Sequence, residues 1–346
     1  MKFTTIPNTE IKVSKICLGT MTFGEQNTEA EAHEQLDFAL DHQVNFIDTA
    51  ELYAVPTRPE TQGLTETYIG NWIAQKKNRD QIVLATKIAG PSRDLNYIRP
   101  NLGYTKDAIT EAIHKSLKRL KTDYIDLYQL HWPDRNANFF GKLGYQKNKN
   151  SSWEDTIHET IKTLDDLLKE GKIRHYGLSN ETPWGVMRHL QESKQHQLTR
   201  AKTVQNPYSL LNRTYEIGLA EISIRENIGL LPYSPMAFGL LSGKFLNGKR
   251  PKNARITLYP QMSRYNNPQV AGIVEKYAVL AQEYSISLAQ MSLAFINQQD
   301  FVTSTIIGAT SLAQLDENIK SIDVVLSDEI LKKINAIHQL QPNPAP

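Results

Sequence analysis

Eight short apolar runs alternate with amphipathic segments along this 346-residue chain, and this alternation limits the possible folds more than any other feature. Runs such as 82–87 (IVLATK) suit buried strands, whereas the apolar residues of 105–120 recur at helical spacing. We predict strands at 15–19, 45–48, 82–87, 125–131, 173–179, 201–205, 229–234 and 304–308. We predict helices at 29–42, 64–77, 105–120, 153–170, 183–195, 214–227, 270–284, 287–298, 311–321 and 326–340.

Parallel strands joined by crossover helices form either a doubly wound sheet or a barrel, and eight such units favour the barrel. We therefore predict an α/β fold, a single (β/α)8 TIM-barrel domain over residues 1–346, with extra C-terminal helices. The segment 3–15 (FTTIPNTEIKVSK) resembles a β-hairpin that turns at 7–9, and we expect it to close the amino end of the barrel.

Composition narrows the classes of function. The net charge is only +2, and the basic clusters lie at apparent helix ends or in loops, so nothing indicates nucleic-acid binding. Cys17 is the single cysteine, which excludes an intrachain disulfide and favours a reducing compartment. Neither an apolar leader nor a run of about 18 apolar residues is present. We expect a soluble, cytoplasmic protein without a membrane partner, while its oligomeric state stays open.

Four polar residues lie where a parallel barrel would bring them together. Asp48, Lys87 and His131 each end a predicted strand, and Tyr53 lies in the loop after the first of these strands. Barrel enzymes place their chemistry at the carboxyl ends of the strands. A tyrosine is a weak acid with a pKa of about 10, and a nearby lysine would lower that pKa. An aspartate can keep the lysine charged and a histidine can bind a carbonyl oxygen, so this set predicts carbonyl reduction.

Each of these residues also has a structural interpretation. Tyr53 is one of fifteen tyrosines, Lys87 could end a strand in solvent, Asp48 could cap the next segment, and His131 could be a hydrogen-bonded core residue. Their joint placement at strand ends favours the functional interpretation. A glycosidase would need a second carboxylate at the strand ends, and a metal hydrolase would need a cluster of His and Asp. The nine histidines are scattered without an HxH pair, so we predict no metal.

A reductase of this kind needs a hydride donor that no side chain supplies. A dinucleotide GxGxxG fingerprint is absent, and GLLSGK at 239–244 lacks the spacing of a P-loop. The glycine-rich loop after the seventh strand and the helix start after the eighth are the usual phosphate positions of barrels. We expect the backbone of 234–243 to cradle a pyrophosphate. Lys244 and Arg255 would bind the 2′-phosphate of NADP(H).

Several motifs occur in the order of one known family. They are LGTMTFG at 18–24, FIDTAELY at 46–53, ATK at 85–87, LYQLHWP at 127–133, GLSN at 177–180, QNPYSLLNR at 205–213, PYSPMAFGLLSGKF at 232–245 and IGATSLAQLDEN at 307–318. From end to end, the sequence resembles the aldo-keto reductases. It is especially similar to the bacterial Tas-type NADP(H)-dependent branch, and more distantly to the potassium-channel β-subunit branch.

The resemblance implies the roles given above for Asp48, Tyr53, Lys87 and His131. It further implies a cofactor site with a nicotinamide part, a pyrophosphate loop and an adenosine part. The nicotinamide part comprises Gly19, Thr20, Met21, Ser179, Asn180, Gln205 and Tyr233, with the last stacking on the ring. The loop comprises Ser234, Pro235, Met236, Ala237, Phe238, Gly239, Leu240, Leu241, Ser242 and Gly243. The adenosine part comprises Gly308, Thr310, Gln314, Glu317 and Asn318, although Gln314 and Glu317 could also be an exposed helix face.

The expected substrate is a small-molecule aldehyde or ketone. Trp132, Phe139, Phe140 and Tyr145 lie in the long connection after the fourth strand and indicate an apolar pocket. We expect the loops 54–66, 89–104, 132–152 and 246–268 to line it. The likeness to channel β-subunits leaves a second hypothesis, in which the reductase fold senses the NADPH redox state for a partner protein. Measured turnover separates the two.

Overall fold

The computed structural model describes residues 1–91, 94–147, 155–260, 263–265 and 267–346. Eight parallel strands form one sheet in the order β10-β3-β4-β5-β6-β7-β8-β9. Every predicted strand is present, but several are shorter than predicted, and β9 keeps only the first two residues of 229–234. The strands are β3 (Ile16–Gly19), β4 (Phe46–Asp48), β5 (Val83–Ile88), β6 (Ile125–Leu130), β7 (Ile173–Ser179), β8 (Thr203–Gln205), β9 (Gly229–Leu230) and β10 (Thr305–Ile307).

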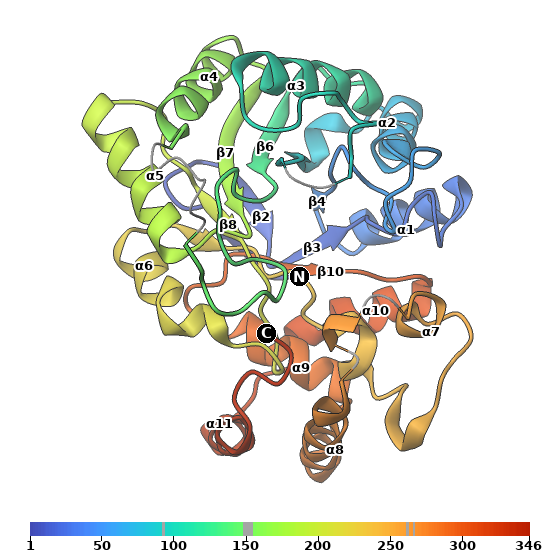
Figure 1. Cartoon of the computed structure of the whole chain (residues 1–346). Coiled ribbons are helices and arrows are strands. Elements are labelled where there is room, and N and C mark those ends of the chain that lie inside the picture. The colour runs from blue at the N-terminus through green and yellow to red at the C-terminus, as the bar shows by residue number, and fades with distance from the viewer. Residues whose placement is uncertain (92–93, 148–154, 261–262, 266) are drawn as a thin grey trace.

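The two edge strands of this sheet, β9 and β10, approach each other and close the ring. Leu230 forms a parallel bridge with Val302, just before β10, and the Ile306 amide donates to the Pro232 carbonyl oxygen at 3.0 Å. Helices surround the strands (Figure 1). The predicted (β/α)8 barrel is thus confirmed.

The helices follow the predicted pattern, except that the short helix α7 lies in the segment 246–268 that was predicted as a loop. They are α1 (Glu29–Asp41), α2 (Leu64–Lys76), α3 (Lys106–Leu120), α4 (Ile157–Lys169), α5 (Pro183–His196), α6 (Leu219–Arg225), α7 (Arg255–Leu258), α8 (Pro268–Glu283), α9 (Leu288–Asn297), α10 (Leu312–Lys320) and α11 (Asp328–Leu340). One prediction was wrong in detail: the segment 214–227 is a 3-10 turn (Thr214–Ile217) followed by α6, because Gly218 leaves the helical conformation. The predicted start of the fourth helix, 153–154, lies outside the described residues.

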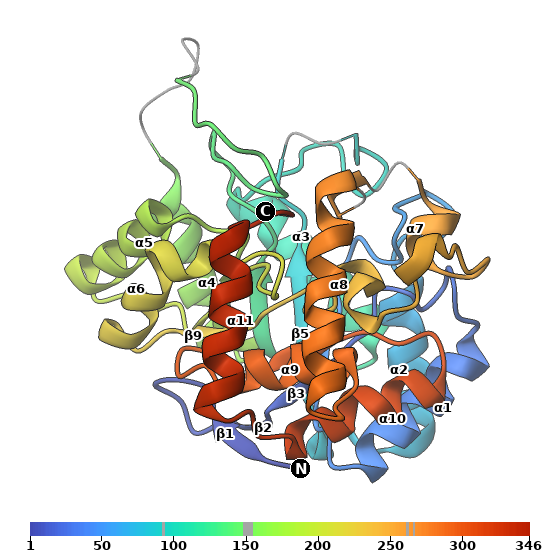
Figure 2. The same cartoon turned by 90° about the horizontal axis from the view of Figure 1, so that it is seen from below.

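An N-terminal hairpin closes the amino end of the barrel, as predicted. Strands β1 (Phe3–Thr5) and β2 (Lys12–Ser14) pair antiparallel. Ile6, Ile11 and Val13 are buried against Cys17 and Phe46, which point from β3 and β4 into the barrel. Figure 2 shows β1 and β2 at the lower end of the barrel, opposite the end where the chain's C-terminus lies. The open end is therefore the carboxyl end of the strands.

Two helices of the outer ring, α2 and α3, meet with backbone against backbone at Gly70. A Cβ built on Gly70 would lie 2.0 Å from the Arg119 carbonyl oxygen and 2.8 Å from the Leu120 backbone. An ion pair between Arg119 Nε and Glu66 Oε2 (2.7 Å) holds the helices at this distance, and the other oxygen of Glu66 accepts from the Thr86 hydroxyl of β5. Only glycine fits at this crossing.

We expect Gly70→Ala to lower the free energy of unfolding by about 2 kcal/mol or more, because the added methyl group forces α2 and α3 apart. The matched control is Gly272→Ala in α8, where a Cβ meets nothing within 4 Å. That change should raise the free energy of unfolding by roughly 0.5–1 kcal/mol, since alanine favours the helix. Urea denaturation of both variants gives their free energies of unfolding. Equal values for the two variants would contradict the close contact between α2 and α3 at Gly70.

Candidate active site

The strand register brings three of the four predicted catalytic residues together. Asp48 ends β4 and Lys87 lies near the end of β5, with 2% and 0% of their surfaces exposed. Lys87 Nζ lies 2.6 Å from Asp48 Oδ2, 2.8 Å from the Thr49 carbonyl oxygen and 3.3 Å from the Tyr53 hydroxyl oxygen. The buried ammonium group thus has three oxygen partners, which uses all of its protons.

The pKa of Lys87 is raised, although burial alone would lower it, because Asp48 and Tyr53 stabilise the charged form. The pKa of Tyr53 is also raised. Burial is the largest cause, and it outweighs the attraction of the Lys87 charge, which acts downward as predicted. The expectation of a net decrease was therefore wrong, because desolvation of the phenolate is the larger effect here. Tyr53 consequently keeps its proton at neutral pH.

His131 follows β6 and faces Tyr53. The two rings pack edge to face with centroids 5.9 Å apart, and His131 is buried. The His131 carbonyl oxygen accepts a hydrogen bond from Asn180 Nδ2 at 2.9 Å, which ties the end of β6 to the end of β7. The imidazole and the phenol therefore share one side of the open end of the barrel, where both are able to approach a carbonyl group.

A pair of glutamines beneath Lys87 and Asp48 completes the network, and only one of them was predicted. Gln129 Nε2 and Gln205 Nε2 donate to Asp48 Oδ1 at 3.0 and 2.8 Å, and Gln205 Nε2 also donates to Gln129 Oε1 at 2.9 Å. All three side chains are buried. Gln129 had a signal in the sequence, because a single amide inside an apolar strand, two residues before His131, points to the same face.

The predicted nicotinamide residues form a second connected group. Ser179 Oγ donates to the Gln205 carbonyl oxygen at 2.9 Å, and Asn180 Nδ2 donates to Ser179 Oγ at 3.1 Å. The Tyr233 hydroxyl donates to Asn180 Oδ1 at 2.7 Å and lies 3.4 Å from Arg264 Nη1. Because both N–H groups of Gln205 Nε2 are already used, that side chain offers only its carbonyl oxygen to a ligand.

A cavity of about 820 Å³ lies at this end of the barrel, near the upper limit of roughly 1,000 Å³ for small-molecule sites. Asp48, Tyr53 and His131 lie at its floor and wall, whereas Lys87 lies behind them and does not line it. Most of the predicted cofactor residues line it: Gly19, Thr20, Met21, Ser179, Asn180, Gln205, Tyr233, Ser234, Pro235, Met236, Phe238, Gly239, Ser242, Lys244, Arg255, Gly308, Thr310, Gln314, Glu317 and Asn318.

The loop after β9 differs from the predicted phosphate cradle. Ala237, Leu240 and Leu241 point into the hydrophobic core and do not line the cavity. The backbone amides of Ala237, Gly239, Leu241 and Gly243 donate to carbonyl oxygens within the loop itself. Those four amides are therefore occupied, because the loop forms tight turns with left-handed residues at 237–239. A pyrophosphate bound here would therefore have to use the other amides of the loop or neighbouring side chains.

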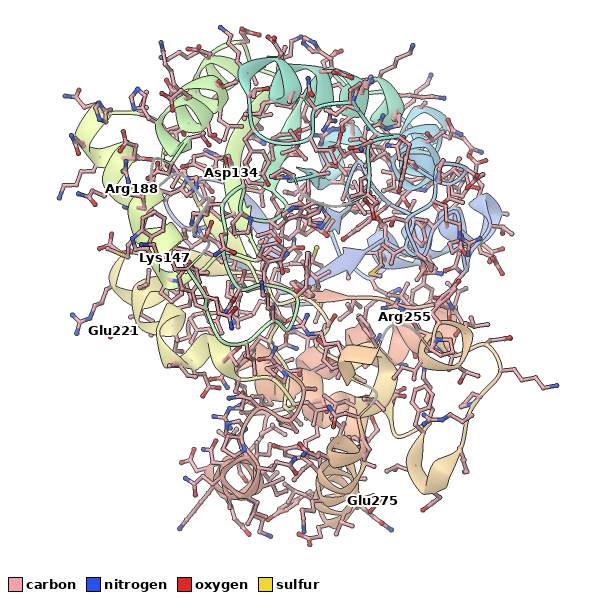
Figure 3. All side chains as sticks on the ribbon, viewed as in Figure 1. Asp134, Lys147, Arg188, Glu221, Arg255 and Glu275 are labelled. Atoms are coloured by element: carbon pink, nitrogen blue, oxygen red, sulfur yellow. The ribbon has the colours of Figure 1, made fainter. Side chains whose placement is uncertain are left out.

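Two cations supply such side chains. Lys244 and Arg255 are half-buried and line the cavity, and Arg255 lies over the Phe238 ring, 5.2 Å from its centroid. Arg255 is labelled in Figure 3. Burial lowers the pKa of both residues, and the Arg255 charge lowers the pKa of Lys244 further. In the part of the chain that the structure describes, neither forms an ion pair with a carboxylate. Two uncompensated cations in one cavity fit a bound phosphate group.

The predicted adenosine residues lie around the start of α10. Gln314 Oε1 accepts from the amide and the hydroxyl of Thr310, at 3.1 and 3.2 Å, and Glu317 Oε1 accepts from Ser287 Oγ at 2.8 Å. Asn318 Nδ2 donates to the Gly308 carbonyl oxygen at 3.2 Å. All of these residues except Ser287 line the cavity, Gln314 as an exposed residue and Glu317 as a half-buried one, and their binding of adenosine stays a prediction.

The remaining wall is largely apolar. Trp132 and Phe140 line the cavity, and Phe139 packs against the cluster that contains Trp132. Tyr145 is 61% exposed and does not line the cavity, contrary to the prediction.

Arg264 Nε donates to the Pro346 carbonyl oxygen at 2.8 Å, and both residues line the cavity, which the sequence did not indicate. Within the predicted loops, residues 92–93, 148–152, 261–262 and 266 lie outside the described residues.

The arrangement of barrel, site and cavity agrees with a family-level comparison. Residues 15–339 match the model of the aldo/keto reductase family, and the chain belongs to that family. It is therefore an oxidoreductase of carbonyl compounds, in a family that generally uses nicotinamide cofactors. In the described residues, no helix is long and apolar enough to cross a membrane.

Three relatives show how far the similarity extends. The chain is 49% identical to "Protein tas" of Escherichia coli, over 100% of both chains. It is 34% identical to "Uncharacterized oxidoreductase YrpG" of Bacillus subtilis, over 97% of this chain and 96% of that one. It is 29% identical to a "Probable voltage-gated potassium channel subunit beta" of Arabidopsis thaliana, over 99% and 98%. The resemblance predicted from the motifs is confirmed.

Proposed function

We propose that the protein reduces an aldehyde or ketone to an alcohol with NADPH, reversibly, with Tyr53 as the proton donor. The observation that carries the proposal is the contact of the Tyr53 hydroxyl with the buried Lys87 ammonium group, which Asp48 keeps charged. The bound nicotinamide supplies the hydride. The name of the Bacillus subtilis relative, an oxidoreductase, is consistent with this chemistry.

The proton transfer follows from the environment of Tyr53. When hydride reaches the carbonyl carbon, the electron pair of the C=O bond moves to oxygen, and Tyr53 gives its proton to that oxygen. A phenolate remains on Tyr53. Its nearest cation is Lys87, 3.3 Å away, so the charge that develops in the transition state meets a fixed positive charge. In alcohol oxidation the same phenolate accepts the proton.

His131 and the apolar wall orient the substrate. The His131 ring beside Tyr53 binds the carbonyl oxygen, and it directs that oxygen toward the phenol. Trp132 and Phe140 contact the rest of the substrate, which favours small carbonyl compounds with an apolar body.

We infer NADPH as the preferred cofactor from Lys244 and Arg255. A 2′-phosphate carries up to two negative charges, and a guanidinium group can bind it with two hydrogen bonds. Both cations are half-buried and lack a carboxylate partner among the described residues, so their desolvation is offset only when an anion binds. Gln205, Ser179 and Asn180 would hold the carboxamide, and Tyr233 would stack on the ring.

Tyr53→Phe should lower kcat by roughly a hundredfold or more, because the ring remains but the proton donor is lost. Binding of NADPH should change little. Stopped-flow single turnover with saturating cofactor measures the chemical step, and cofactor fluorescence measures binding. The control is Tyr124→Phe, at the opposite end of β6, which should behave like the wild type. Hydride transfer at a near wild-type rate in Tyr53→Phe would rule out Tyr53 as the acid.

Lys87→Met should lower activity and shift the pH dependence upward. The Lys87 charge lowers the pKa of Tyr53 against the effect of burial, so its loss leaves burial unopposed and raises that pKa further. Alcohol oxidation needs the phenolate, and its rise with pH should therefore move to higher pH in the variant. The measurement is kcat/KM for oxidation as a function of pH. An unchanged profile with high activity would mean that Lys87 is structural.

Arg255→Ala should weaken NADPH binding by roughly tenfold to a hundredfold, the range for a lost hydrogen bond to a charged group, and leave NADH nearly unaffected. Lys244→Ala should weaken both, because Lys244 also lies near the expected pyrophosphate. Fluorescence titration with each cofactor decides this, with Lys249→Ala, exposed in the same loop, as the control. If Arg255→Ala loses NADPH and NADH equally, Arg255 organises the loop and does not bind the 2′-phosphate.

A further inference from the structure

Two histidines and a glutamate meet on the outside of the barrel, where α4 packs against α5. His158 Nδ1 lies 2.8 Å and His196 Nε2 lies 3.0 Å from the same oxygen, Oε1 of Glu192. The three ligand atoms all lie within 4.8 Å of one another, and the two imidazole rings pack edge to face. None of the three residues lines the cavity described above.

The carboxylate at the centre of this cluster is held in place. Glu192 is 4% exposed, and its second oxygen, Oε2, accepts a hydrogen bond from Arg188 Nη1. Arg188 Nε in turn lies 3.1 Å from Asp155 Oδ2 (Arg188 is labelled in Figure 3). Glu192 is therefore a fixed group with Oε1 directed at both imidazoles.

We propose that His158, Glu192 and His196 bind one divalent transition-metal ion, with zinc as the best-matched probe. Two imidazole nitrogens and one carboxylate oxygen are a preferred ligand set for zinc, which leaves a fourth position for water. Zinc lies about 2.0–2.2 Å from such ligands, so both rings must turn to bring their nitrogens around one ion beside Oε1. Magnesium and calcium prefer oxygen ligands and fit poorly.

The surroundings permit that movement. The His158 and His196 side chains are 39% and 40% exposed, so both rings can turn and water can reach the fourth position. Glu192 and His196 are four residues apart on α5 and share one face of that helix. Arg188 holds the ligating carboxylate from behind, which is the role of an outer-shell partner in known metal sites.

The ion would join the consecutive helices α4 and α5 on the outside of the barrel. His158 lies in the first turn of α4, where the chain returns to the barrel after the long connection from β6, and His196 is the last residue of α5. Because the cluster lies outside the cavity, the ion would stabilise the fold and take no part in hydride transfer. Without an ion, His158 forms a hydrogen bond to Glu192 Oε1 and His196 lies 3.0 Å from the same oxygen, so the experiment must separate the ion-bound from the ion-free state.

The test uses the full chain without a polyhistidine tag, treated with a chelator and then titrated with zinc chloride by calorimetry. The expected result is one saturable site per chain, with at least tenfold weaker binding in both His158→Gln and His196→Gln. Glutamine keeps a hydrogen-bond donor for Glu192 but is a poor zinc ligand, so each fold should persist. His114→Gln, an exposed histidine on α3, is the matched control and should bind like the wild type.

Thermal unfolding supplies a second measurement. Zinc should raise the Tm of the wild type and of His114→Gln, since an ion that binds only the folded state stabilises it, and should leave the Tm of His196→Gln unchanged. Carbonyl reductase activity should be the same in all three proteins. The proposal is overturned if no saturable site appears, or if both ligand variants keep wild-type affinity. If one variant fails to fold without metal, the other decides.

Discussion

The buried ion pair between Lys87 and Asp48 is the interaction on which the rest of the site depends. A desolvated ammonium group is unfavourable unless every proton has a partner, and here Asp48, the Thr49 carbonyl oxygen and Tyr53 supply the partners. The parallel register of β4 and β5 opposes Asp48 to Ala85, which leaves Lys87 two residues further along the same face. A shift of one residue in this register would turn Lys87 out of the barrel.

The protein treats its buried cations in two different ways. The charge of Lys87 is balanced within the structure by Asp48, whose other oxygen is held by Gln129 and Gln205. Lys244 and Arg255 at the far side of the cavity have a depressed pKa instead. The charge of Lys87 is balanced by Asp48 without a ligand, whereas the charges of Lys244 and Arg255 have no carboxylate partner among the described residues. The two groups still act on each other, because the Arg255 charge lowers the pKa of Tyr53 and Tyr53 raises that of Arg255.

Much of the fold and of the candidate site could be predicted from the sequence, because the spacing of apolar residues and the place of a residue at a strand end are local properties of the chain. The strand ends at Asp48, Lys87 and His131 follow from apolar runs, and parallel strands place those ends on one rim. What could not be predicted depends on packing between distant segments. The net pKa of Tyr53 is set by burial, the loop amides near Gly239 are used within their own turns, and the cluster around Glu192 joins residues that share no motif.

The N-terminal hairpin affects the order in which a cofactor and a substrate could bind. Because Ile6, Ile11 and Val13 fill the amino end of the barrel, a cofactor and a substrate bound as proposed would pass through the same mouth. Gln205, which would bind the carboxamide, is buried beside Asp48, whereas Trp132 and Phe140 lie on the outer wall. The molecule that reaches deeper must then arrive first and leave last. The hairpin at one end of the barrel would thereby impose an ordered sequence of binding and release at the other end.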